Sequence, residues 1–160
     1  MAKTYEPIAT ITPTGSQTTV TFSNIPGTFT DLVIVAGSVS ASAGDQLFVR
    51  FNSDTASNYS RTWLRTPAGS ERTANATLAL MTAQSFLGST HINTSVAHVM
   101  NYSNTTTNKT MLARNSGTRD GVDLIVNLWR STAAITSITL LTSGNFTNTT
   151  VFSLYGIKAA

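Results

Sequence analysis

The sequence predicts an all-β protein, an antiparallel β-sandwich of jelly-roll-like type with about ten short strands. Polar and apolar residues alternate in short runs from Ile8 to the C-terminus, and Gly, Pro, Asn, Asp and Ser interrupt the runs. Ser, Thr and Asn are abundant, which favours extended structure and turns over helix. No segment has helical periodicity over the length of a crossover helix, so an antiparallel sandwich or barrel is favoured over a βαβ arrangement.

The first expected strands show the pattern clearly. Thr19–Phe22 alternates Thr with apolar residues, Leu32–Ala36 is apolar on both faces, and Pro26-Gly27 supplies the turn between them. The other expected strands share a short length and flanking turn residues: Leu47–Phe51, Tyr59–Leu64, Thr77–Met81, Val96–Tyr102, Thr110–Arg114, Val122–Arg130, Ile135–Leu141 and Val151–Ile157. Ala76–Leu87 is rich in helix-favouring residues, so a short helix is the alternative there.

Length and composition predict one soluble domain over residues 1–160. A chain of 160 residues can bury a core without disulfides or metals. It contains no Cys, which excludes disulfides, thiolate nucleophiles and zinc-thiolate sites. The N-terminus lacks the apolar stretch of a secretory signal, and no later run reaches membrane-spanning length. We therefore expect a chain made in the cytoplasm that does not contact a membrane.

Charged residues are scarce and dispersed. They make up 11% of the chain, less than half of the roughly 25% that is typical of soluble domains. The net charge of +3 comes from ten Lys and Arg against seven acids. The nearest approach to a basic cluster is Arg50, Arg61, Arg65 and Arg72, which forms no continuous stripe, so we expect no nucleic-acid partner.

Catalytic signatures are missing, so we expect no enzyme, no catalytic residues and no cofactor. The chain has neither a Gly-x-Ser-x-Gly motif nor a Gly-rich phosphate loop, and it offers only two His and seven acids for proton transfer. His91 and His98 are seven residues apart, which places them on opposite faces of an unbroken strand and precludes a shared metal. We expect surface or interface positions for both. Asp120 and Asp123 are expected to end a loop or protect an edge strand.

One segment offers oxygen ligands for a hard cation. Asn52 and Asp54, together with Asp45, could bind calcium. The favoured alternative is that the Asn and Asp side chains close Asx turns between two strands, which requires no ion.

Four aromatic residues are candidates for an interface or a ligand site. Trp63 and Trp129 lie in strand-like runs, where packing in the core is favoured over a subunit interface or a sugar-binding surface. Tyr59 and Tyr102 are the end residues of two expected strands, next to loops, where exposed aromatic rings could form a shallow glycan site.

Several blocks together resemble a family of small bacteriophage virion proteins, and the likeness covers almost the whole chain. The blocks are Tyr5-Glu6-Pro7-Ile8-Ala9, Phe22-Ser23-Asn24-Ile25-Pro26, Thr30-Asp31-Leu32-Val33, Arg50-Phe51-Asn52-Ser53-Asp54, Asn58-Tyr59-Ser60, Leu128-Trp129-Arg130-Ser131-Thr132-Ala133-Ala134-Ile135 and Leu154-Tyr155-Gly156-Ile157-Lys158. The combination is specific, whereas each block alone is weak. No active site is carried over with the resemblance.

The resemblance implies a virion structural protein. The favoured role is a capsid decoration or cement protein, a homotrimer that binds the major capsid protein or another virion protein outside the head and stabilises the shell. The alternative is a tail-fibre or tail-tip subunit that contacts host glycans. The sequence shows no coiled-coil, collagen-like or β-helical pattern of a shaft, so we do not expect a long fibre unless a separate protein supplies the shaft.

Overall fold

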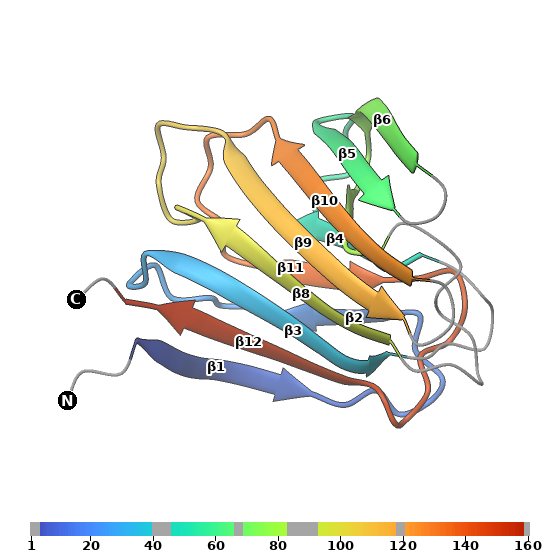
Figure 1. Ribbon diagram of the computed structural model, residues 1–160. Coiled ribbons are helices and arrows are strands. Elements are labelled where there is room, and N and C mark those ends of the chain that lie inside the picture. The colour runs from blue at the N-terminus through green and yellow to red at the C-terminus, as the bar shows by residue number, and fades with distance from the viewer. Residues whose placement is uncertain (1–3, 40–45, 66–68, 83–92, 118–120, 159–160) are drawn as a thin grey trace.

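The computed structural model describes residues 4–39, 46–65, 69–82, 93–117 and 121–158. These residues form twelve strands and no helix, and the strands build two antiparallel sheets that pack as a β-sandwich (Figure 1). The expected fold class, an all-β antiparallel sandwich, is confirmed.

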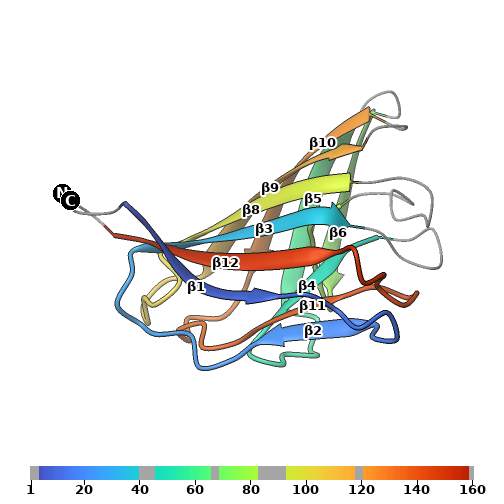
Figure 2. The ribbon, with the colours of Figure 1, turned by 90° about the horizontal axis from the view of Figure 1, so that it is seen from below.

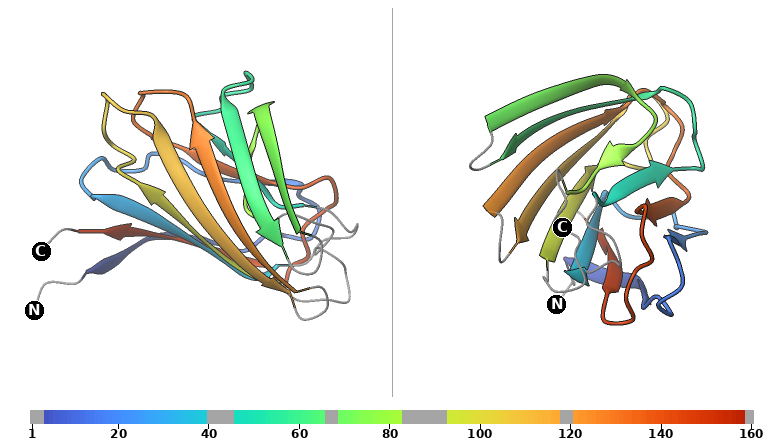
Figure 3. Two further views of the ribbon diagram at one scale, coloured as in Figure 1. Left: turned by 45° about the horizontal axis from the view of Figure 1, so that its top comes forward. Right: turned by 90° about the vertical axis from the view of Figure 1, so that its right-hand side faces the viewer.

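The two sheets differ in size, and the larger curls around the smaller (Figures 2 and 3). The larger sheet has the order β1 (Tyr5–Ile11), β12 (Val151–Ile157), β3 (Asp31–Val39), β8 (Asn93–Met100), β9 (Lys109–Gly117), β10 (Gly121–Trp129), β5 (Tyr59–Arg65) and β6 (Gly69–Ala76). The smaller sheet has the order β2 (Thr19–Phe22), β11 (Ile138–Leu141), β4 (Phe48–Phe51) and β7 (Ala79–Leu80).

Two hairpins lengthen the larger sheet on one side. Without them, the larger sheet would read β1-β12-β3-β8 and the smaller β2-β11-β4-β7. The hairpins β9–β10 and β5–β6 join this framework through pairing of β8 with β9 and of β10 with β5. We call β9, β10, β5 and β6 the four-strand extension.

The core lies between the sheets and follows the two-residue period of the strands. Val20 and Phe22 on β2 are buried, as are Ile138 and Leu140 on β11. An aromatic cluster connects β4 with the extension. The ring centre of Trp129 lies 5.5 Å from that of Phe51 and 6.3 Å from that of Tyr59. These contacts join the hairpins to the smaller sheet.

The expected strands agree with the structure in part. Thr19–Phe22 matches β2 at both ends, and most other expected strands overlap an observed one. The structure adds β1 and β6, which were not expected as strands. A helix over the described part of Ala76–Leu87 is wrong, because β6 ends at Ala76 and β7 follows at Ala79–Leu80; residues 83–87 lie outside the described residues.

Candidate interaction face on the larger sheet

The loop with calcium candidates is closed by hydrogen bonds. Asp54 Oδ1 accepts from the Ala56 amide at 2.9 Å, which forms an Asx turn, and Asp54 Oδ2 accepts from Asn58 Nδ2 at 2.9 Å and Trp129 Nε1 at 2.7 Å. Burial raises the pKa of Asp54, but these hydrogen bonds outweigh it and hold the pKa below its usual value. The carboxylate is thus committed to the turn and to the aromatic cluster.

Asn52 is occupied in the same way. Its Oδ1 accepts from the amides of Thr136 at 2.8 Å and Ser137 at 3.1 Å, and its Nδ2 donates to the Ala134 carbonyl at 2.7 Å. Its φ of 50° belongs to the left-handed region, which Asn tolerates better than most residues. Asp45, the third calcium candidate, lies outside the described residues.

Tyr59 and Tyr102 are buried, which corrects the expectation of an exposed glycan site, whereas Trp129 packs in the core, the position favoured for it from the sequence. Tyr59 and Tyr102 are fully buried and Trp129 is 3% exposed, while Trp63 is half-buried against the core. The Tyr59 hydroxyl accepts from the Phe51 amide at 3.0 Å, and the Tyr102 hydroxyl donates to the Pro26 carbonyl. Both hydroxyls are therefore satisfied by backbone groups inside the fold.

A buried polar row crosses the inner side of the larger sheet. Asp123 pairs in register with Arg65 on β5 and with Asn115 on β9. Asn115 Nδ2 donates to Asp123 Oδ2 at 3.4 Å, and Ser95 Oγ donates to Asn115 Oδ1 at 2.7 Å. The expectation that Asp123 ends a loop or protects an edge is wrong, since it is 3% exposed inside the central strand β10. Asp120 lies outside the described residues.

The four arginines that came nearest to a basic cluster do not form one. Arg65 is buried, and its guanidinium lies 5.0 Å from the ring centre of Trp63. Arg61 faces the same inner side, 5.5 Å from the ring centre of Phe48. Arg50 lies on the smaller sheet, and Arg72 points outward from β6. The basic side chains are thus divided between both sheets and both sides of the larger one.

The side of the larger sheet that points away from the smaller sheet exposes large apolar side chains. We call it the outer face. Its exposed apolar members, with their exposed fractions, are Tyr5 57%, Leu64 56%, Val122 54%, Leu124 49%, Val126 47%, Met100 37%, Leu112 37% and Val151 37%. Five of these eight lie on the four-strand extension: Leu64, Leu112, Val122, Leu124 and Val126.

Strand register brings these side chains into two neighbouring rows. In one row Leu124 on β10 pairs with Leu64 on β5 and with Arg114 on β9, and Arg114 pairs with Val96 on β8. The next row runs from Val126 through Leu112 to His98. Since partners in register lie about 5 Å apart, Leu64, Leu124, Val126 and Leu112 form a cluster of neighbouring exposed apolar side chains, with Arg114 and His98 at its edge.

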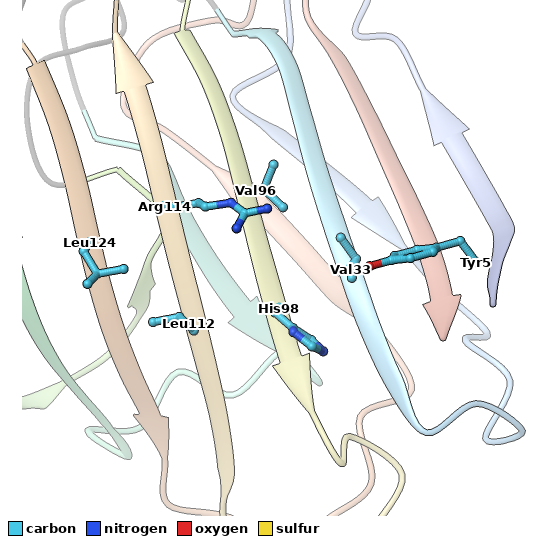
Figure 4. A pocket seen from close by; sticks show the side chains of 7 residues that line it. All are labelled: Tyr5, Val33, Val96, His98, Leu112, Arg114 and Leu124. Carbon is cyan, nitrogen blue, oxygen red and sulfur yellow. The ribbon is translucent and has the colours of Figure 1, made fainter. Parts of the chain in front are cut away.

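A hollow of about 170 Å³ lies on this surface (Figure 4). Tyr5 extends from β1 toward Val33, and the guanidinium of Arg114 lies beside Val96 on the neighbouring strand. The full set of lining residues is Tyr5, Val33, Val96, His98, Leu112, Arg114 and Leu124. A second open hollow of about 330 Å³ continues past Arg114, bordered by Thr94, Ser116 and Val122.

Positive charge predominates among the described outward positions of this sheet. Both carboxylate oxygens of Asp31, an acid on this side, already have partners. Its Oδ2 lies 3.1 Å from His98 Nε2, and its Oδ1 accepts from the Asn101 amide at 2.6 Å. Arg114 is exposed, and its guanidinium has no hydrogen bond or ion pair within the described part of the chain. His98 was expected at a surface or interface position, and it lies on this face; His91 is outside the described residues.

Sequence reasoning did not single out the outer face. The available signal was the run Val122–Trp129, which carries apolar residues in both phases of a strand. Such a run indicates a strand buried on both sides, yet here only the inner side is covered. Pairing with β5 and β9 is needed to see that Leu64 and Leu112 join the exposed residues of β10.

Within the described residues, no group of three or more His, Asp or Glu could hold a metal ion. The described part of the chain also has no helix that is long and apolar enough to cross a membrane.

Comparisons with known proteins identify no family. No family model matches the chain, and no curated protein matches it. One solved structure is similar at a low level, a protein of unknown function from Shewanella oneidensis, with 6% identity and a TM-score of 0.24 over 98% of this chain and 77% of that one.

Proposed function

We propose that this protein is a structural subunit of a bacteriophage particle, a capsid decoration protein that packs its outer face against the shell. The observation that carries the proposal is the cluster of exposed Leu and Val side chains on neighbouring strands of the outer face. Exposed apolar side chains that are grouped, rather than scattered singly, mark interaction sites. A protein whose work is to bind other subunits needs such a surface.

The order of the strands supports a virion role. With the two hairpins set aside, the orders β1-β12-β3-β8 and β2-β11-β4-β7 support a jelly-roll interpretation of the sandwich, a fold used by viral capsid proteins and also by lectins and cupins. The fold is shared by several functions, so this support is an analogy and the apolar face remains the primary argument. The resemblance of the sequence blocks to phage virion proteins points in the same direction.

The tail-tip alternative loses its main support. It depended on exposed Tyr59 and Tyr102, and both are fully buried. A non-catalytic role and assembly as a homotrimer remain parts of the proposal. Light scattering on the purified chain measures the oligomeric state, and a stable monomer would overturn the trimer while leaving shell binding open.

The direct test is to purify the phage particles that carry the gene, identify the chain by mass spectrometry and trace it in cryo-electron microscopy density. We expect many symmetric copies on the outside of the head. Removal of the protein should lower the temperature at which particles rupture, because a ligand of the assembled shell stabilises it by mass action. A few copies confined to the tail would favour the tail-tip role, and absence from particles would overturn both.

A further inference from the structure

We infer that the outer face binds a partner surface in which a carboxylate side chain lies among apolar ones, with Arg114 as the residue that receives the carboxylate. This inference rests on the proposed function, and it names the chemistry of the partner.

The charge of Arg114 favours an acidic group on the partner. Arg114 is exposed between apolar neighbours, because it pairs in register with Leu124 on one side and Val96 on the other. The acid on the described part of this face, Asp31, already bonds His98 and the Asn101 amide. When apolar contact removes water, an unpaired guanidinium would be left desolvated, which is costly unless the partner supplies an acceptor. A carboxylate fits its planar donors best.

A second copy of the same chain is disfavoured as the occupant of the outer face. If two outer faces met, each would bring Arg114 and Arg72, while Asp31 would stay committed to His98. Like charges brought together at an interface disfavour the contact. A different protein is therefore the better occupant, and contacts within a homotrimer would use other surfaces.

The shape of the two hollows fits protein side chains. The hollow beside Arg114 measures about 170 Å³, less than the roughly 300 Å³ at which small-molecule sites begin, and it is open to solvent. The adjoining hollow, about 330 Å³, reaches that size but is more open. Two shallow depressions on either side of one cation suit neighbouring side chains of a protein surface better than one enclosed ligand.

The test uses two peptides as probes of the purified full chain, acetyl-Leu-Glu-Leu-amide and its Gln counterpart. Methyl signals of Val96, Val33 and Leu112 in ¹H–¹³C spectra report occupancy of the hollow. We expect the glutamate peptide to shift these signals with an affinity roughly tenfold or more above that of the glutamine peptide, because a charge-assisted hydrogen bond is stronger than a neutral one.

Arg114→Gln should abolish this preference, whereas the matched control Arg72→Gln, an outward cation outside the hollow, should keep it. Equal shifts from both peptides, no shift up to their solubility limit, or an unchanged preference in Arg114→Gln would overturn the inference. Sedimentation with phosphatidylglycerol vesicles that depends on Arg114 would also overturn it, in favour of a lipid surface.

These outcomes are independent of the particle experiment. If the peptide preference is found but the chain is absent from virions, the proposed function fails and the partner chemistry stands. If the chain decorates the head but the peptides are not distinguished, only the inference about Arg114 fails.

Discussion

The two sides of β10 carry apolar residues of the same kind in different surroundings. On the inner side Ile125 is fully buried and Trp129 is 3% exposed, whereas on the outer side Leu124 and Val126 leave about half of their surface in water. Folding accounts for the inner residues, because they are covered by the smaller sheet and its loops. It does not account for the outer ones, since polar β-formers such as Thr would serve equally well at a solvated strand position. In the proposed function, the inner side supplies stability and the outer side binds the partner.

The largest effect is expected at Trp129, where the inner side holds the extension to the rest of the fold. Trp129→Ala removes contacts with Phe51 and Tyr59 and the hydrogen bond to Asp54, so we expect a loss of about 3–5 kcal/mol in the free energy of unfolding. Urea denaturation measures it. Trp129→Phe is the control, which keeps an aromatic ring and should lose about 1–2 kcal/mol. If Trp129→Ala lost less stability than Trp129→Phe, Trp129 would not hold the extension to the rest of the fold.

The second prediction concerns pH and the buried hydroxyl of Tyr59. Burial raises the pKa of Tyr59 from its usual 10 to about 12. Because the folded-state pKa is higher than that of the unfolded chain, the protonated Tyr59 hydroxyl contributes fully to the free energy of unfolding below pH 10. This contribution is lost as the pH rises toward 12. The difference between a pKa of 10 and one of about 12 corresponds to about 2–3 kcal/mol in the free energy of unfolding.

Tyr59→Phe serves as the reference for this measurement. It should be less stable than the parent by about 1 kcal/mol at neutral pH, because the Phe51 amide loses its acceptor. The difference between the two proteins should then shrink, and can reverse, above pH 10. Burial lowers the pKa of Lys109, so its titration acts in the opposite direction in both proteins and cancels in the difference. A constant difference up to about pH 12 would refute the raised pKa.

A third prediction compares two glycines on opposite sides of the larger sheet. A Cβ at Gly156, on the inner side of β12, would lie 2.2 Å from Phe29 Cγ, whereas a Cβ at Gly37 on β3 would find its nearest atom, the Val151 carbonyl oxygen, at 3.9 Å. Gly156→Ala should therefore cost about 1–3 kcal/mol through overpacking, and Gly37→Ala should be close to neutral. Thermal unfolding of both variants measures the contrast. Phe29→Ala combined with Gly156→Ala should recover part of the loss, and no recovery would argue against the clash.

The sequence predicted the inner side better than the outer side. Val20 and Phe22 alternate with Thr on β2, so burial and strand boundaries followed from periodicity alone. The strand β6 was missed because Gly69–Ala76 has almost no apolar residues; it is an edge strand whose formation depends on pairing with β5.

The candidate site was harder to predict, for a physical reason. Tyr59 lies just after polar loop residues, which suggested exposure, but its ring packs in the core and its hydroxyl accepts from the Phe51 amide. The outer face depends on register between strands far apart in the chain, since Leu64, Leu112 and Leu124 become neighbours only through β5, β9 and β10. Local patterns contain no information about that pairing.

The smallest expected change in stability is the sharpest test of the comparison, and it uses adjacent residues of one strand. Leu124→Thr replaces a half-exposed outer residue with a good β-former, so we expect a change within about 0.5 kcal/mol. Ile125→Thr, one position along, places a hydroxyl in the core and should cost about 2 kcal/mol or more. If urea denaturation gave equal losses, the outer face would be part of the folding core. If Leu124→Thr left stability unchanged and weakened attachment to the particle, the apolar outer residues would be retained for binding.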